Sequence, residues 1–113
     1  MTTNQKPGPW SPAEDAAIVA DYFAALDMLA KGLPVNKSAT RRALVPKLNG
    51  RPEGSIEFKR CNVSAILRAE GFAWWPGYRP EVGENYARGL ETAVRAELAR
   101  RAPALVARME AAG

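Results

Sequence analysis

The segment from about Pro52 to Ala69 constrains the fold more than any other part of the chain, because its apolar residues fall on two opposite sides of a helix. At about 100° per residue, the first side carries Ile56, Val63, Ile66 and Leu67, and the second carries Phe58, Cys61 and Ala65. A helix with two apolar faces packs against neighbours on both sides. We therefore expect this helix to be nearly central in the fold, with both faces mostly buried, Phe58 included.

Such a helix leaves only a narrow polar stripe for solvent. The stripe contains Glu57, Arg60, Ser64 and Arg68, and Lys59 and Asn62 lie at its other edge. Because Arg60 and Ser64 are one turn apart, we expect their side chains to be exposed on the same side of the helix. The expected solvent face of this helix is therefore polar and mostly basic.

The first helix of the chain has a strong start signal. Ser11 can cap it, Pro12 fits the first helical position, and Glu14 stands three residues after the cap, as in a capping box. The apolar stripe that follows predicts a helix as far as Lys31, and Gly32 suits its carboxyl end.

Two weaker helical segments complete the pattern. A short helix can be capped by Asn36 or Ser38, and it ends or bends near Pro46, which lacks an N–H. The last helix begins near residues 84–85 and is expected to end or kink at Pro103.

The whole chain of 113 residues has the length of one domain, and no segment alternates apolar and polar residues as a half-buried strand does. We therefore expect an all-α fold of four to five helices. Its expected divisions are a disordered lead-in over 1–9, a single helical domain over 10–102, and a short C-terminal helix or tail over 103–113.

Residue counts exclude several classes of function. The chain has no histidine and a single cysteine, Cys61, so it has no Ser-His or Cys-His centre, no common zinc site and no internal disulfide. We expect no enzyme activity and no cofactor. No apolar run approaches the roughly 20 residues that span a bilayer, and no signal sequence is visible, so we expect a cytoplasmic protein with no membrane partner.

Positive charge is concentrated in the middle of the chain. Residues 36–68 contain eight cations and two acids, whereas the remainder contains eight cations and ten acids. A basic segment in a nearly neutral protein favours a polyanionic partner, although charge clusters on small domains are more often solvated faces. The residues expected to clamp phosphates are Lys37, Arg41, Arg42 and Arg51, and those expected nearer base edges are Lys59, Arg60, Asn62, Ser64 and Arg68.

Two runs of the sequence resemble a Myb- or SANT-like domain. They are Trp10-Ser11-Pro12-Ala13-Glu14-Asp15 before the first helix, and Leu48, Gly50, Arg51, Gly54, Ser55 and Ile56 before the third. The resemblance implies a helix-turn-helix-like three-helix core with a C-terminal helical extension, in which Trp10 packs into the core. It also implies that the third helix enters the major groove of DNA.

A broader resemblance covers about three-quarters of the chain, from Trp10 to about Val94. The runs that carry it are Asp21-Tyr22-Phe23, Asn36-Lys37, Leu48-Asn49-Gly50-Arg51, Gly54-Ser55-Ile56-Glu57-Phe58-Lys59, Asn62-Val63-Ser64-Ala65-Ile66-Leu67 and Pro76-Gly77-Tyr78-Arg79-Pro80. These runs resemble an N-terminal helical domain of bacterial restriction-associated proteins, where it precedes nuclease- or helicase-type domains. The resemblance implies a non-catalytic DNA-targeting module in restriction or phage defence. The alternative is a docking module that recruits a nuclease or helicase.

Three smaller features have competing interpretations. Glu57 and Lys59 have the E-x-K spacing of a class of metal-dependent nucleases, but residues i and i+2 of a helix point apart. The aromatic loop of Trp74, Trp75 and Tyr78 can stack on an exposed base or close the core. Cys61 is expected to be a small buried apolar residue.

Overall fold

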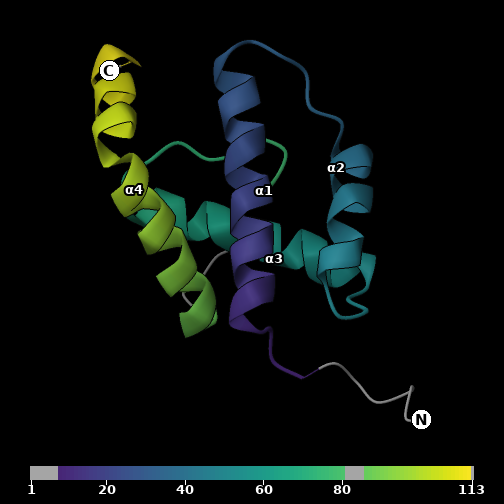
Figure 1. Cartoon of the computed structure of the whole chain (residues 1–113). Helices are drawn as coiled ribbons and strands as arrows, with labels where there is room; N and C mark the ends of the chain where they lie inside the picture. Colours follow the sequence, from purple (N-terminus) through teal and green to yellow (C-terminus); the bar gives the residue numbers. More distant parts are fainter. Residues whose placement is uncertain (1–7, 81–85, 113) are drawn as a thin grey trace, which may run out of the picture.

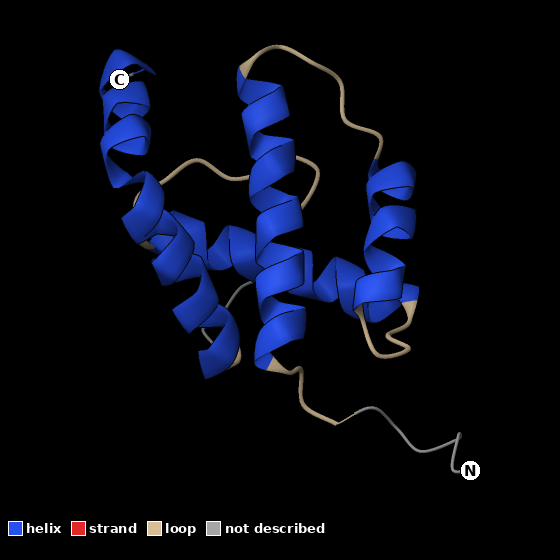
Figure 2. Ribbon diagram, in the orientation of Figure 1, coloured by secondary structure: helices blue, strands red, loops and turns tan. Residues whose placement is uncertain are grey.

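The computed structural model describes residues 8–80 and 86–112, with side chains as far as Arg101. Its elements are α1 (Pro12–Ala30), α2 (Lys37–Leu44), the short 3₁₀ helix η1 (Val45–Lys47), α3 (Glu53–Ala69) and α4 (Arg88–Ala112). The described residues contain no strand (Figure 2), so the expected all-α class is confirmed. Most of the expected lead-in, and the expected start of the last helix at 84–85, lie outside the described residues.

The four helices are arranged around a crossing (Figure 1). Helices α1, α2 and α4 run roughly alongside one another, and α3 runs across them. Helix α1 contacts α2, α3 and α4, and α3 also contacts α4. Helix α1 therefore packs against all the other α-helices, and α3, which was expected to be central, packs against α1 and α4.

The start of α1 follows its sequence signal. The Ser11 hydroxyl accepts a hydrogen bond from the Glu14 N–H at 3.1 Å, and the Glu14 carboxylate accepts one from the Ser11 N–H at 3.0 Å. This capping box satisfies two of the N–H groups that a helix start leaves without partners. Beyond the other end of α1, Gly32 has a φ of 77°, which other residues rarely adopt. Trp10 packs against the core, as expected.

One apolar face of α3 is buried as expected, and the other is buried only in part, since Ala65 is buried but Phe58 is not. Ile56, Val63 and Ile66 are at most 1% exposed, whereas Phe58 is 55% exposed. The prediction that Phe58 is buried was wrong, because the neighbouring helices and the loop over residues 70–80 cover the polar residues of α3 in its place. Cys61 is half-buried against the core.

Helix α4 is longer than expected. It continues through Pro103 to Ala112, so the prediction that the helix ends at this proline was wrong. The alternative of a kink agrees with the change of direction that α4 shows between its green and yellow parts (Figure 1). A proline inside a helix removes one backbone hydrogen bond without always ending the helix. In the described side chains, Leu90, Val94 and Leu98 face the core at the expected four-residue spacing. None of the helices in the described part of the chain is long and apolar enough to cross a membrane.

Candidate nucleic-acid interface

Arg60 is the residue whose position differs most from expectation. Its side chain is 0% exposed, so the prediction that it lies on a solvent stripe was wrong. The guanidinium donates to Asp21 Oδ2 at 2.6 Å, to the Tyr78 hydroxyl at 2.8 Å and to Thr40 Oγ1 at 3.3 Å. These partners come from α1, α2 and the loop after α3, and their hydrogen bonds hold the guanidinium inside the protein. Arg60 is therefore unavailable to DNA bases.

Aromatic rings complete the enclosure of Arg60. The guanidinium carbon lies 5.1 Å from the centre of the Trp75 ring and 5.3 Å from that of Tyr78. The two rings meet edge to face at 4.7 Å. Because Trp75 and Tyr78 are both buried, the loop closes the core with them and cannot offer them to an exposed base or to a partner protein.

Ser64 is also buried and was wrongly expected to be exposed. Its hydroxyl forms a 2.6 Å hydrogen bond with the hydroxyl of Tyr22, which in turn accepts one from the Trp75 N–H at 2.8 Å. Burial raises the pKa of Tyr22 to about 12, against 10 for an exposed tyrosine. Ser64 thus belongs to a polar chain that links α1, α3 and the loop after α3.

Lys59 and Asn62 are 8% and 6% exposed, so their assignment to a base-reading surface was wrong as well. The Lys59 ammonium lies over the Trp10 ring at 5.1 Å and close enough to the Asp15 carboxyl for electrostatic attraction. Burial lowers the pKa of Lys59 and raises that of Asp15, whose Oδ1 has no hydrogen-bond partner among the described residues.

Arg51 is a structural residue and not a phosphate clamp. Its guanidinium donates to both carboxylate oxygens of Glu14, each at 2.8 Å, and to the carbonyl oxygens of Gly8 and Pro9. The side chain is 6% exposed. These hydrogen bonds from Arg51 are the main reason that the pKa of Glu14 falls to about 2. The prediction for Arg51 was therefore wrong, because its charge holds the start of α1 to the turn before α3.

Two cations of α2 contact the rest of the protein while staying partly accessible. The Lys37 ammonium donates to the Gly77 carbonyl at 2.9 Å and lies 4.2 Å from the centre of the Tyr78 ring. Arg41 is 3.6 Å from carboxylate oxygens of both Glu53 and Glu57, with 20% of its side chain exposed. These contacts fix α2 against α3 and the loop.

Arg42, Lys47 and Arg68 are exposed and form no ion pair with any described residue. Arg42 and Lys47 belong to α2 and η1, but Arg68 lies at the opposite end of α3 from the point where α2 docks. Eleven residues separate it from Glu57, which is about 16 Å along a helix axis. The structure thus brings together the cations of α2 and η1, and it separates them from Arg68.

Sequence reasoning did not single out Arg79 as a functional residue. This exposed arginine follows Gly77 and Tyr78, both of which contact Lys37 at the start of α2. It therefore adds a cation next to α2. The sequence shows only that Arg79 is a charged residue in the Pro76–Pro80 turn. It does not show that the turn lies beside α2, because the two segments are 40 residues apart in sequence.

Glu57 and Lys59 do not converge. Glu57 accepts a hydrogen bond from the Tyr78 hydroxyl at 3.1 Å and faces Arg41, whereas Lys59 faces Trp10 on another side of α3. The described residues contain no group of three or more acidic, histidine or cysteine side chains that could hold a metal ion. The E-x-K spacing therefore does not form a nuclease-like arrangement in this part of the chain.

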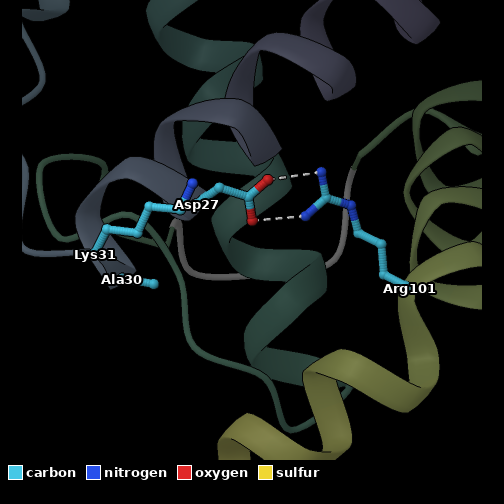
Figure 3. A pocket seen from close by; sticks show the side chains of 4 residues that line it. All are labelled: Asp27, Ala30, Lys31 and Arg101. Carbon is cyan, nitrogen blue, oxygen red and sulfur yellow. Dashed lines mark hydrogen bonds and ion pairs between the residues drawn. The ribbon is translucent and has the colours of Figure 1, made fainter.

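A pocket of about 500 Å³ opens between the end of α1 and α4, lined by Asp27, Ala30, Lys31 and Arg101 (Figure 3). The Arg101 guanidinium donates hydrogen bonds to both carboxylate oxygens of Asp27, at 2.9 and 3.0 Å, and also to the Glu97 carboxylate. Its charge is therefore used to join two helices. Asp27 and Arg101, which line the pocket, are therefore paired with each other and are not offered to a small ligand as two separate charges.

The fold is all-α, and α2 presents exposed cations on its surface. Comparisons with models of protein families, with curated proteins and with solved structures find no match to the chain.

Proposed function

We propose that this protein is a non-catalytic module that binds duplex DNA through its backbone phosphates, in a restriction or phage-defence setting. The observation that carries the proposal is the charge of the segment over residues 37–47, which holds four cations and no acid. This segment forms α2 and η1, and α2 buries only Leu44.

The α2 surface, as we name it, consists of Lys37, Arg41, Arg42, Lys47 and Arg79. Phosphates attract such a surface because each neutralised phosphate releases condensed counterions. Arg42 and Lys47 are exposed, and no acid competes for them within the segment. They are therefore accessible to a polyanion.

The setting follows from the resemblance to restriction-associated proteins. Its most specific run, Leu48-Asn49-Gly50-Arg51, has a structural role here, because the Asn49 N–H and the Arg51 side chain both bind Glu14. In this chain the run therefore joins the turn before α3 to α1. The docking alternative has less support, since Trp75 and Tyr78 are buried and cannot face a partner.

Fluorescence anisotropy with a labelled duplex, at several salt concentrations, tests the proposal. Binding should weaken steeply with salt, and the Lys47→Ala/Arg79→Ala variant should reduce the slope of log K against log salt by about two phosphate contacts. The matched control is Arg68→Ala/Arg88→Ala, which removes the same charge from exposed positions on α3 and α4. The control should bind nearly as the parent does. Absence of binding to any duplex at low salt would overturn the proposal.

A further inference from the structure

Resting on the proposed function, we infer that α2, and not α3, is the helix that reads base edges in the major groove, with Arg42 as the specificity-determining residue. The inference begins with α3, where four of the five reading candidates are inside the protein and the fifth, Arg68, is exposed at the end of the helix away from α2. Lys59, Arg60, Asn62 and Ser64 are each at most 8% exposed. A helix whose polar side chains are enclosed cannot present them to a groove.

The contacts of α2 divide it into two faces. The inner face consists of Lys37, Thr40, Arg41 and Leu44. Lys37 contacts the loop after α3, and Thr40 contacts Arg60. Arg41 faces the carboxylates of α3, and Leu44 packs in the core. At about 100° per residue, the opposite face carries Ser38, Ala39, Arg42 and Ala43. Of these only Arg42 is charged. All four are exposed.

The outer face of α2 suits a groove in shape. An α-helix with its side chains is about 10–12 Å across, and the major groove is about 12 Å wide. Ala39 and Ala43 flank Arg42 and let the helix approach the base edges closely, and alanine methyls can contact thymine methyls. An arginine in this position reaches guanine O6 and N7, the commonest specific contact to a base.

The other cations of the α2 surface suit the phosphates on either side. Lys37 and Arg41 lie toward the inner face of α2, Lys47 lies beyond its carboxyl end and Arg79 lies beside its start. A helix held this way presents its outer face to the groove, and the cations at its edges lie toward the phosphates on either side. Its inner face is also fixed, since Leu44 is 2% exposed and Arg60 donates to Thr40. A fixed helix can hold a bidentate geometry.

The experiment uses a pool of 20-base-pair duplexes with randomised centres, because the target sequence is unknown. The wild-type protein is used to select an enriched duplex, and affinities for that duplex and for the unselected pool are compared among variants. Arg42→Lys keeps the charge but loses the planar fork that binds guanine bidentately. We expect it to reduce the preference for the enriched duplex by about tenfold or more, with little change in affinity for the pool. Lys47→Ala should weaken both by the same factor.

The outcomes separate this inference from the proposed function. If the wild-type protein binds no duplex at low salt, the proposed function and the inference both fail. If it binds but enriches no sequence, or if Arg42→Lys keeps the full preference, only the inference is overturned. Because the Arg42 side chain is exposed and forms no ion pair or hydrogen bond with a described residue, the variant should fold normally, which circular dichroism checks.

Discussion

The guanidinium of Arg60 shows how a single charge organises this protein. It is 0% exposed, and three oxygen atoms from separate parts of the chain accept its hydrogen bonds. Its Nε has no partner among the described residues. Burying a charge is costly unless it is paired, so the pairing with Asp21 is what makes this position tolerable. The periodicity of α3 could not reveal this, because Asp21 is 39 residues away.

Removing the Arg60 side chain should strongly destabilise the fold. The Arg60→Ala variant leaves Asp21 without its ion-pair partner and empties space between two aromatic rings. We expect the free energy of unfolding to fall by about 3–5 kcal/mol. Urea unfolding followed by circular dichroism measures this. The control Arg68→Ala, an exposed arginine on the same helix, should change it by less than about 0.5 kcal/mol. Equal stability of the two variants would contradict the role given to Arg60.

Glu14 should make stability depend on pH in the acidic range. Its pKa is about 2 in the folded protein, against an ordinary value of 4.5, so the folded state binds this proton less readily than the unfolded state. The stabilisation by ionised Glu14 is therefore complete above about pH 4.5 and is lost as the pH falls toward 2. The measurement is the difference in unfolding free energy between wild type and Glu14→Gln.

That difference should be largest near neutral pH and should shrink toward pH 2. The control Glu53→Gln changes a carboxylate that is 66% exposed, and its difference should be small throughout. A Glu14→Gln difference that does not vary with pH would show that the ionised carboxylate contributes nothing beyond its shape.

Among the elements, the helices were predictable where local sequence decides them. The capping box at Ser11 and Glu14 could be predicted, and the cap of α2 could be narrowed to two candidates, of which the structure has Asn36 and not Ser38. The orientation of α3 about its own axis could not be predicted. It depends on partners such as Tyr22 for Ser64, which make the polar side of the helix favourable to bury. Phe58 is left exposed as a result.

The packing of α4 on α1 predicts that a glycine-to-alanine replacement, which usually stabilises a helix, destabilises the protein at Gly89. Gly89 lies so close to the buried Asp15 that a methyl group there would come within 2.8 Å of Oδ2. Glycine-to-alanine replacements in helices ordinarily stabilise by about 0.5–1 kcal/mol. We expect Gly89→Ala to destabilise by about 1 kcal/mol or more, because the enclosed carboxylate must move.

Thermal unfolding with Gly54→Ala as control tests this expectation. A methyl group at Gly54 would meet nothing within 4 Å, so this variant should be unchanged or slightly more stable. If Gly89→Ala is as stable as Gly54→Ala, the contact between Asp15 and the start of α4 is loose.

At the scale of the whole molecule, the fold separates the cations of the basic middle segment into enclosed ones and surface ones, whereas the sequence shows them as a single cluster. Residues 36–68 contain eight cations, of which Arg51, Lys59 and Arg60 are enclosed by acidic or aromatic side chains. The all-α class and the basic character of this region were predictable from composition and periodicity. Which cations stay at the surface was not, since that depends on where Glu14 and Asp21 of α1 come to lie. The candidate interface therefore moves from α3 to α2.

The attachment of α4 to the rest of the molecule provides the last prediction. Arg101 binds both oxygens of Asp27, contacts Glu97 and lies 4.9 Å from the centre of the Phe23 ring. The side chains of Arg101 and Asp27 are partly exposed, so solvent screening limits the contribution of their ion pair to about 1 kcal/mol. We expect Arg101→Ala to accelerate amide hydrogen exchange about fivefold in the part of α4 beyond Leu98.

The earlier part of α4 should keep its protection, because Leu90 and Val94 are 0% exposed and hold it to the core. The control is Arg95→Ala, since Arg95 is 53% exposed and pairs with Glu70 and Glu91 at the surface. It should leave exchange beyond Leu98 unchanged. If Arg101→Ala and Arg95→Ala give the same exchange pattern, apolar packing alone attaches the end of α4. If Arg101→Ala accelerates exchange equally along all of α4, the helix detaches as one unit and Arg101 is not a local fastening.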